Sequence, residues 1–211
     1  MSASFCQSND GTHVPVINGK SLESLNQPMR DAKRWVERET DKILNFENVA
    51  VMGLGSGAYI IELAQTFPEK QFFVFECLDR DESAPQIKLP KNVTLIPCQS
   101  IDDVLGADSA KSLLKKPFRI LRHPGAYRFF SGFFDEVIQF LTGRSKAGFK
   151  WNIQQRPSQA KFFRQWDKYL NGEMISGRPI TVVDVGRFAT THANQGGYEF
   201  SIWSSLRELV K

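Results

Sequence analysis

The sequence is poor in the residues that build metal sites and disulfide frameworks. It holds three histidines and three widely spaced cysteines, Cys6, Cys77 and Cys98, with no Cys-x-x-Cys pair and no Cys/His cluster. This pattern argues against a zinc site and against a disulfide scaffold. We interpret the cysteines as free thiols in a reducing cytoplasm, with Cys77 and Cys98 as small buried hydrophobes at two strand ends, and we expect no metal.

Long apolar runs are also missing. The most apolar stretch, residues 49–61, is too short and too rich in glycine to span a membrane. Residues 1–10 have neither the basic region nor the apolar region of a signal peptide. The sequence shows no Ser-His-Asp set, no Gly-x-Ser-x-Gly elbow and no Walker loop. We therefore expect a cytoplasmic protein without a transmembrane segment. Without these motifs, the sequence gives no support to a hydrolase or NTPase of the corresponding classes.

The charge is unevenly distributed along the chain. Residues 111–168 hold 13 Lys and Arg against 3 Asp and Glu, which makes this block strongly basic. Such a block could bind phosphates, nucleic acid or acidic headgroups, or it could be a solvated face or a docking patch for an acidic partner protein. The helical spacing of Phe162, Phe163 and Trp166 favours core packing over stacking on bases. Nucleic acid is therefore the less favoured partner.

Apolar runs alternate with helical patterns through the middle of the chain. Residues 48–52, 71–76, 92–96 and 118–121 predict strands, and the near-continuous apolar run at 71–76 is typical of a strand covered on both faces. This alternation predicts an α/β fold of the Rossmann-like, S-adenosylmethionine (SAM)-methyltransferase-like kind, a mostly parallel sheet with helices on both faces. Two later apolar runs, residues 180–185 and 198–203, are compatible with an antiparallel hairpin at the C-terminal edge of the sheet.

The domain organisation is expected to be simple. Residues 1–12 are small and polar without a period, and we expect them to be disordered. Residues 13–211 then form a single Rossmann-like domain, which begins with a strand–helix extension over residues 13–46. Within that extension Asn18-Gly19 predicts a tight turn, and Pro28 opens a helix that runs to about Leu44.

A glycine-rich turn follows the first strand of the predicted sheet. Gly53, Gly55 and Gly57 alternate with other residues at the junction of a strand and a helix. Glycine lets the chain reverse sharply and lets a ligand approach the backbone, and the following helix offers free N–H groups. Glu76 ends the next strand, where an acidic residue typically holds ribose hydroxyls. These four residues are our cofactor-binding candidates.

The turn admits two ligand classes. Gly53-x-Gly55-x-Gly57 resembles the first motif of SAM methyltransferases, whereas Gly53-x-Gly55-x-x-Ala58 fits the dinucleotide fingerprint. Methyltransferases usually have an acidic residue two places before the first glycine, and this chain has Val51 there. The cofactor expectation is therefore SAM or a nucleotide-sugar, and a plain tight turn is the structural alternative.

Two further positions follow predicted strands. His123 lies directly after the fourth strand, where it is a candidate base, or a surface residue of a Pro-Gly turn. Asp102 follows the third strand, where an acid could meet an adenine amino group. Asp102 and Asp103 could equally be first-turn acids that favour the helix dipole.

Three stretches of the chain are similar to a known family. Residues 17–24 (Ile-Asn-Gly-Lys-Ser-Leu-Glu-Ser), 26–32 (Asn-Gln-Pro-Met-Arg-Asp-Ala) and 51–59 (Val-Met-Gly-Leu-Gly-Ser-Gly-Ala-Tyr) resemble the N-terminal domain of the motility-associated factor (Maf) glycosyltransferases. That family resembles enzymes that place sialic-acid-like sugars on flagellin. Its transferase activity is attributed to a following domain with a Gly-x-Gly-Pro-Ser type motif, which this sequence does not contain, and its members commonly have His where Glu23 stands.

Three functions follow from these patterns. The resemblance implies a Maf-like accessory module that binds a nucleotide or nucleotide-sugar and works with a partner protein or transferase domain in surface or flagellar glycosylation. The glycine turn with Glu76 also fits a small SAM-dependent methyltransferase. The basic block at 111–168 fits a nucleic-acid or phosphate-binding protein. An enzymatic activity is left open, with methyl transfer favoured over glycosyl transfer for this chain alone.

Overall fold

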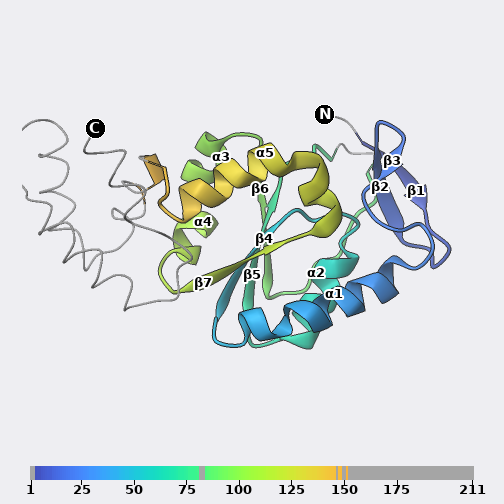
Figure 1. The fold of residues 1–211 in the computed structure, drawn as a ribbon, viewed down its shortest axis with the longest axis horizontal. Coiled ribbons are helices and arrows are strands. Elements are labelled where there is room, and N and C mark those ends of the chain that lie inside the picture. The colour runs from blue at the N-terminus through green and yellow to red at the C-terminus, as the bar shows by residue number, and fades with distance from the viewer. Residues whose placement is uncertain (1–2, 81–83, 146, 149–150, 152–211) are drawn as a thin grey trace, which may run out of the picture.

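The computed structural model describes residues 3–80, 84–145, 147–148 and 151 (Figure 1). A small antiparallel sheet comes first and is followed by alternating helices and strands. The elements are β1 Ser4–Gln7, β2 His13–Ile17, β3 Lys20–Ser21, α1 Pro28–Ile43, β4 Asn48–Met52, α2 Ala58–Thr66, β5 Gln71–Glu76, β6 Val93–Pro97, α3 Ile101–Gly106, α4 Asp108–Leu113, β7 Phe118–Arg122 and α5 Pro124–Leu141.

The larger sheet is parallel throughout its four strands, in the order β6-β5-β4-β7. Strand β4 lies in its interior and every residue of that strand is buried. Side chains of successive residues point to opposite faces, so Val49 and Val51 join one apolar cluster while Ala50 and Met52 join another. The sequence-based prediction of an α/β, Rossmann-like parallel sheet is confirmed.

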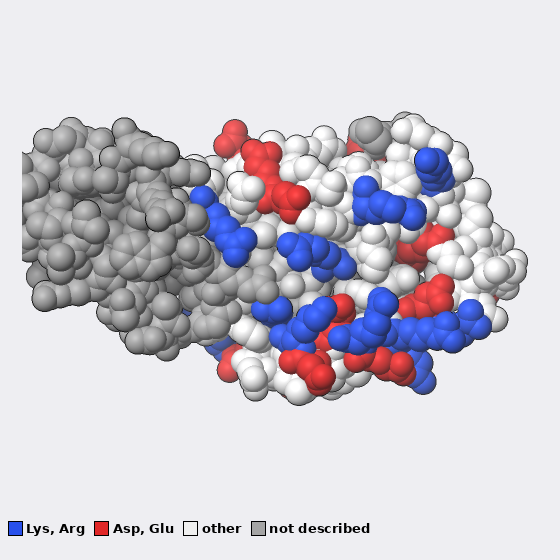
Figure 2. Space-filling model, in the orientation of Figure 1, with Lys and Arg blue, Asp and Glu red and all other residues white. Residues whose placement is uncertain are grey.

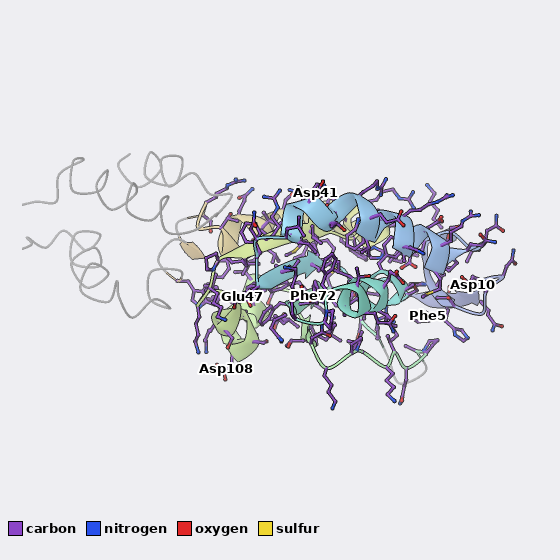
Figure 3. The ribbon with its side chains drawn as sticks, turned by 90° about the horizontal axis from the view of Figure 1, so that it is seen from below. Phe5, Asp10, Asp41, Glu47, Phe72 and Asp108 are labelled. Atoms are coloured by element: carbon purple, nitrogen blue, oxygen red, sulfur yellow. The ribbon has the colours of Figure 1, made fainter. Side chains whose placement is uncertain are left out.

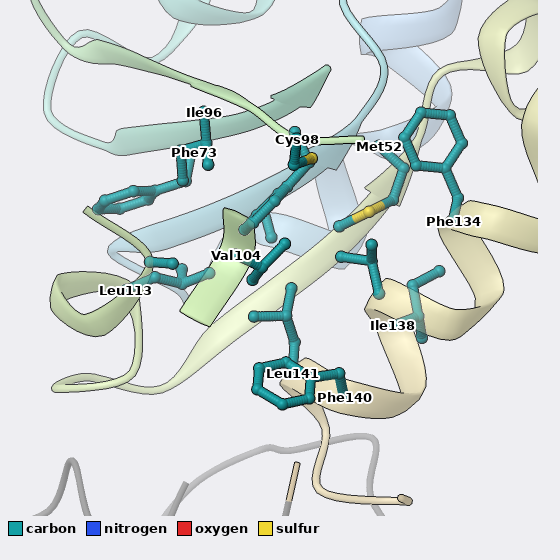
Figure 4. Packing of buried hydrophobic residues seen from close by; sticks show 14 of the residues in the cluster. Met52, Phe73, Ile96, Cys98, Val104, Leu113, Phe134, Ile138, Phe140 and Leu141 are labelled. Carbon is teal, nitrogen blue, oxygen red and sulfur yellow. The ribbon is translucent and has the colours of Figure 1, made fainter. Parts of the chain in front are cut away.

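Helices cover both faces of this sheet (Figure 1). α1 and α2 pack on the face of Val51, and α3, α4 and α5 pack on the face of Met52. Figure 4 shows the second layer, where Phe134 and Ile138 of α5 lie close to Met52. Burial on both faces explains why the strand sequences are almost continuously apolar. The hairpin expected from 180–185 and 198–203 lies outside the described residues.

The outer face of α1 is a solvated charged surface. Basic and acidic side chains alternate along this helix on the face seen in Figure 2. Figure 3 shows Asp41 on this outer side, whereas Phe72 of β5 lies inside the molecule and is fully buried. Lys42 and Glu39 form an ion pair three residues apart, at 2.6 Å. Such exposed pairs contribute little to stability, so the packing of the apolar stripe holds α1 in place.

The N-terminal segment corrects one expectation. Residues 1–12 were expected to be disordered, but β1 pairs antiparallel with β2. The Ser8 hydroxyl donates to an Asp10 carboxylate oxygen at 2.6 Å, and the Ser8 amide donates to the Thr12 carbonyl at 2.8 Å, which closes the turn between the strands. The strand has an almost wholly exposed burial pattern, so it lacks the apolar alternation by which a strand is recognised in sequence.

Candidate functional site

The strand order creates a switch point between β4 and β7. From β4 the chain crosses over to β5 on one side and returns to β7 on the other, and open α/β sheets bind ligands where the order reverses in this way. The glycine turn follows β4 and His123 follows β7. The His123 amide donates to the Met52 carbonyl at 3.1 Å, so the structure brings two sequence-predicted candidates, Gly53 and His123, to the same place.

The three glycines of the turn have backbone angles that favour glycine. Their φ values are +97° at Gly53, +60° at Gly55 and +88° at Gly57. The space above them is filled by the chain itself, because a Cβ at Gly53 would lie 2.3 Å from the Ala126 Cβ and a Cβ at Gly57 would lie 2.7 Å from Ile87 Cγ2. The residues of the turn are all buried. The glycines are therefore required by close intramolecular packing.

Glu23 occupies the centre of the turn, and sequence reasoning did not select it. The Ser56 amide donates to its Oε1 at 2.6 Å and the Ser56 hydroxyl donates to its Oε2 at 2.5 Å. A Cβ at Gly55 would lie 2.0 Å from Glu23 Oε1. Helix α2 begins directly after Gly57, and its N-terminal N–H groups and dipole favour negative charge. This carboxylate therefore sits where such turns hold an anion. The one sequence feature that drew attention to Glu23 was the family resemblance, in which Glu23 stands where family members commonly have His.

The electrostatics of Glu23 favour its ionised form. Burial raises the pKa of its carboxyl, but the interaction with His123 and the hydrogen bonds from Ser56 outweigh burial and lower the pKa below its ordinary value. The side chain is 1% exposed, so the cost of burying this carboxylate is offset by its contacts with Ser56 and His123.

His123 is buried, which differs from the expected surface alternative, and it begins helix α5. The Ala126 amide donates to its Nδ1 at 3.1 Å, so Nδ1 carries no proton and the proton of the neutral ring lies on Nε2. Nε2 is 3.1 Å from Glu23 Oε1, although its N–H is not aligned for a well-formed hydrogen bond. The candidate base is thus a buried N-cap residue that faces a carboxylate.

Glu76 ends β5 beside the turn, as predicted, and both of its oxygens are engaged. Oε2 accepts from the Leu54 amide at 2.8 Å and Oε1 accepts from the Leu78 amide at 2.7 Å. The residue is 5% exposed. A ribose ligand would have to share lone pairs that already bind backbone N–H groups. In this conformation Glu76 links the glycine turn, through Leu54, to the segment that follows β5, through Leu78.

Arg80 is a second residue that the sequence did not single out. Its Nη2 donates to the Gly55 carbonyl, while Nε and Nη1 are buried without a hydrogen-bond partner among the described residues. The guanidinium lies 5.5 Å from the centre of the Phe5 ring, so β1 helps to hold it. Burial lowers the pKa of Arg80, and the negative charges of Glu76 and Glu23 partly offset that effect.

Asp102 lies in the first turn of α3 and is exposed. The neighbouring Asp103 forms a capping box with Ser100, in which the Asp103 carboxylate accepts from the Ser100 amide at 2.8 Å. Asp103 therefore has the alternative role, that of a first-turn acid that stabilises the start of a helix. For Asp102, adenine binding stays a prediction.

The described part of the basic block uses several of its cations locally. Lys116 pairs with Glu47, Lys111 pairs with Asp108, and the Arg122 guanidinium lies over the Tyr127 ring. Residues 152–168 of the block lie outside the described residues. Within the described ranges, no group of three or more His, Cys, Asp or Glu side chains is placed to hold a metal ion. No helix in those ranges is long and apolar enough to cross a membrane.

No family model and no curated protein matches the sequence. Among solved structures, the crystal structure of MNMC2 from Aquifex aeolicus is similar over 51% of this chain and 46% of that chain, with 10% sequence identity and a TM-score of 0.33. The fold assignment therefore rests on the strand order and helix layers described above.

Proposed function

We propose that this chain is an accessory module of the Maf type, linked to surface or flagellar glycosylation, whose glycine turn is held closed by Glu23. The resemblance of residues 17–24, 26–32 and 51–59 supports the Maf type, and the closed turn rests on the contact between Glu23 and Ser56. This contact fills the place where a nucleotide phosphate would bind with a carboxylate of the chain itself, and a second negative charge there would be repelled. A module with this closed turn is better suited to a structural role or to binding a partner protein than to catalysis.

The arrangement of the resembling stretches also supports the proposal. Residues 17–24 and 51–59 are separate in sequence, and the Glu23–Ser56 contact joins them in space. Two of the three stretches that resemble the Maf domain are therefore in direct contact. Both ring nitrogens of His123 face groups of the chain, so the His123 imidazole is not poised to transfer a proton to a bound substrate.

Deletion of the gene in its source organism tests this role. Mass spectrometry of flagellin and surface glycoproteins would compare the parent, the deletion strain and a strain complemented with the wild-type gene. We expect the deletion to remove or reduce the sugar mass and complementation to restore it. Unchanged glycan masses would contradict the proposal.

A SAM-binding protein is the second candidate, because the Glu76 carboxylate lies beside the turn at the end of β5. Calorimetric titration with SAM, S-adenosylhomocysteine, CMP-sugars and UDP-sugars distinguishes the two. Micromolar binding of SAM or S-adenosylhomocysteine that is lost in Glu76→Ala, and kept in Glu37→Ala on the exposed face of α1, would favour methyl transfer. Absence of SAM and S-adenosylhomocysteine binding would remove this candidate.

A further inference from the structure

The Glu23 carboxylate is bound as an external anion would be bound. Three donors converge on it: the Ser56 amide, the Ser56 hydroxyl and His123 Nε2. The N-terminus of α2 follows directly at Ala58, and helix N-termini favour negative charge. We call these three donors the cradle.

His123 gives independent support for a ligand-binding cradle. Its side chain is completely buried, and within the described residues Nε2 has no well-formed hydrogen bond. Nε2 lies directly over the turn, because it would be 2.5 Å from a Cβ at Gly55. A buried N–H without a good acceptor is costly, so a carboxylate freed from the constraint of the Glu23 backbone would satisfy it better. The cradle thus has donor capacity that Glu23 does not fully use.

We propose that the glycine turn is a binding site for a small carboxylate, which the chain itself fills with Glu23. A planar carboxylate matches the cradle because its two oxygens accept from the Ser56 amide and hydroxyl while one of them also faces His123 Nε2. A tetrahedral phosphate would bring further oxygens into a site whose walls are already in contact. A ligand that enters must displace Glu23.

The segment that carries Glu23 is held close to the sheet edge. The Leu22 carbonyl would lie 1.8 Å from a Cβ at Gly125, so the glycine at the start of α5 allows the two backbones to touch. Displacement of Glu23 therefore requires the Leu22–Glu23 segment to move away from α5, and the chain competes with any external carboxylate.

Chemical rescue tests the cradle directly. Glu23→Ala removes the internal carboxylate and leaves room for formate or acetate, whereas Glu23→Gln keeps the shape and leaves none. Melting temperatures of both variants and of wild type would be measured in sodium formate, acetate, phosphate and chloride at equal ionic strength and pH. We expect formate or acetate to raise the melting temperature of Glu23→Ala saturably by about 3 °C or more, because a ligand that binds only the folded state stabilises it. Wild type and Glu23→Gln should not respond.

Several outcomes would overturn the proposal. An equal rise in all three proteins would mean a non-specific salt effect, and no rise in Glu23→Ala would mean that the cradle does not take a free carboxylate. A rise with phosphate as large as with acetate would overturn the carboxylate class. If Glu23→Ala does not fold in chloride, refolding from denaturant in acetate and in chloride replaces the melting curve. Recovery in acetate alone would support the cradle, and equal recovery or none would overturn it.

This inference concerns the same turn as the proposed function and rests on it only in that Glu23 closes the turn. The rescue experiment measures carboxylate binding by the purified chain, whereas gene deletion measures glycosylation in the cell. Each proposal can therefore fail independently of the other.

Discussion

Glu23 and His123 face each other across Gly55, with His123 Nε2 3.1 Å from Glu23 Oε1 and with side chains that are 1% and 0% exposed. One residue follows the N-terminal antiparallel sheet and the other follows the edge strand β7 of the parallel sheet. The contact therefore ties the N-terminal extension to the carboxyl edge of the main sheet. Loss of one partner from a buried pair leaves the other without compensation, which makes such pairs sensitive to mutation.

A double-mutant cycle should reveal this coupling. We expect Glu23→Gln and His123→Ala each to lower the free energy of unfolding by about 2–4 kcal/mol, since each leaves buried polar groups without partners. The double variant should cost less than the sum, by about 1 kcal/mol or more. Urea unfolding followed by tryptophan fluorescence measures this, because Trp35 lies 5.5 Å from Tyr59, whose ring is 4.6 Å from His123.

Two controls sharpen the cycle. His123→Asn keeps a side chain that can cap α5 but is too short to reach Glu23, so its cost reports mainly the lost pair. Glu37→Gln, on the exposed face of α1, should change stability by less than about 0.5 kcal/mol. Strict additivity of Glu23→Gln and His123→Ala would contradict the coupling.

The pH dependence of stability should carry the signature of Glu23. Its pKa is lower in the folded protein than the ordinary value, because interactions with His123 and Ser56 outweigh burial. A group with a lowered folded pKa contributes stability that is present above its unfolded pKa of about 4.3 and is lost as the pH falls through the folded value. The stability difference between wild type and Glu23→Gln should therefore be full near pH 7 and shrink below about pH 4.

Other carboxyl groups also have lowered pKa values, among them Asp10 and Asp103, so the wild-type curve alone does not isolate Glu23. The difference between the two proteins does isolate it, since these groups are common to both. A difference that stays constant or grows on acidification would contradict the assignment.

The fold could be predicted from sequence because its main signals are local. The run at 71–76 is apolar at almost every position, and the strand it predicts is buried on both faces. Ser100 is of a residue type that favours the position before a helix, and it caps α3. β1 was missed because its side chains are mostly exposed, and the pairing that stabilises it comes from β2.

The candidate site was predictable only in part, because its chemistry depends on long-range contacts. Gly53, Gly55 and Glu76 were selected from a strand–turn–helix pattern that is continuous in sequence. The positions that fill the turn, Glu23 and Arg80, meet it only after folding, and nothing in their local sequence marks them as buried. A charged residue in a polar stretch is normally exposed, so composition alone gives the wrong expectation here.

Gly55 should be highly sensitive to substitution. Gly55→Ala places a Cβ 2.0 Å from Glu23 Oε1 and 2.5 Å from His123 Nε2, at a backbone φ of +60°. We expect a loss of about 3 kcal/mol or more, from overpacking together with an unfavourable backbone conformation. Gly132→Ala is the matched control, because it lies in α5 with no atom within 4 Å of the added Cβ and should stabilise by about 0.5–1 kcal/mol.

Both glycine variants would be compared by urea unfolding with the same fluorescence signal. Similar stabilities for Gly55→Ala and Gly132→Ala would show that the turn tolerates a side chain and that Glu23 does not lie against it.

The three cysteines should differ sharply in reactivity. Burial and the nearby Glu76 carboxylate raise the pKa of Cys77 and of Cys98 to about 12, and Cys98 is only 2% exposed, whereas Cys6 is exposed in β1. The thiolate is the reactive species, so at pH 8 a chromogenic disulfide reagent should modify Cys6 rapidly and the other two slowly. Cys6→Ser should abolish the fast phase, and denaturant should release two further thiols. Rapid reaction of a thiol in folded Cys6→Ser would mean that the edge of the sheet near Glu76 opens readily, and the closed turn proposed for this protein would then have to be abandoned.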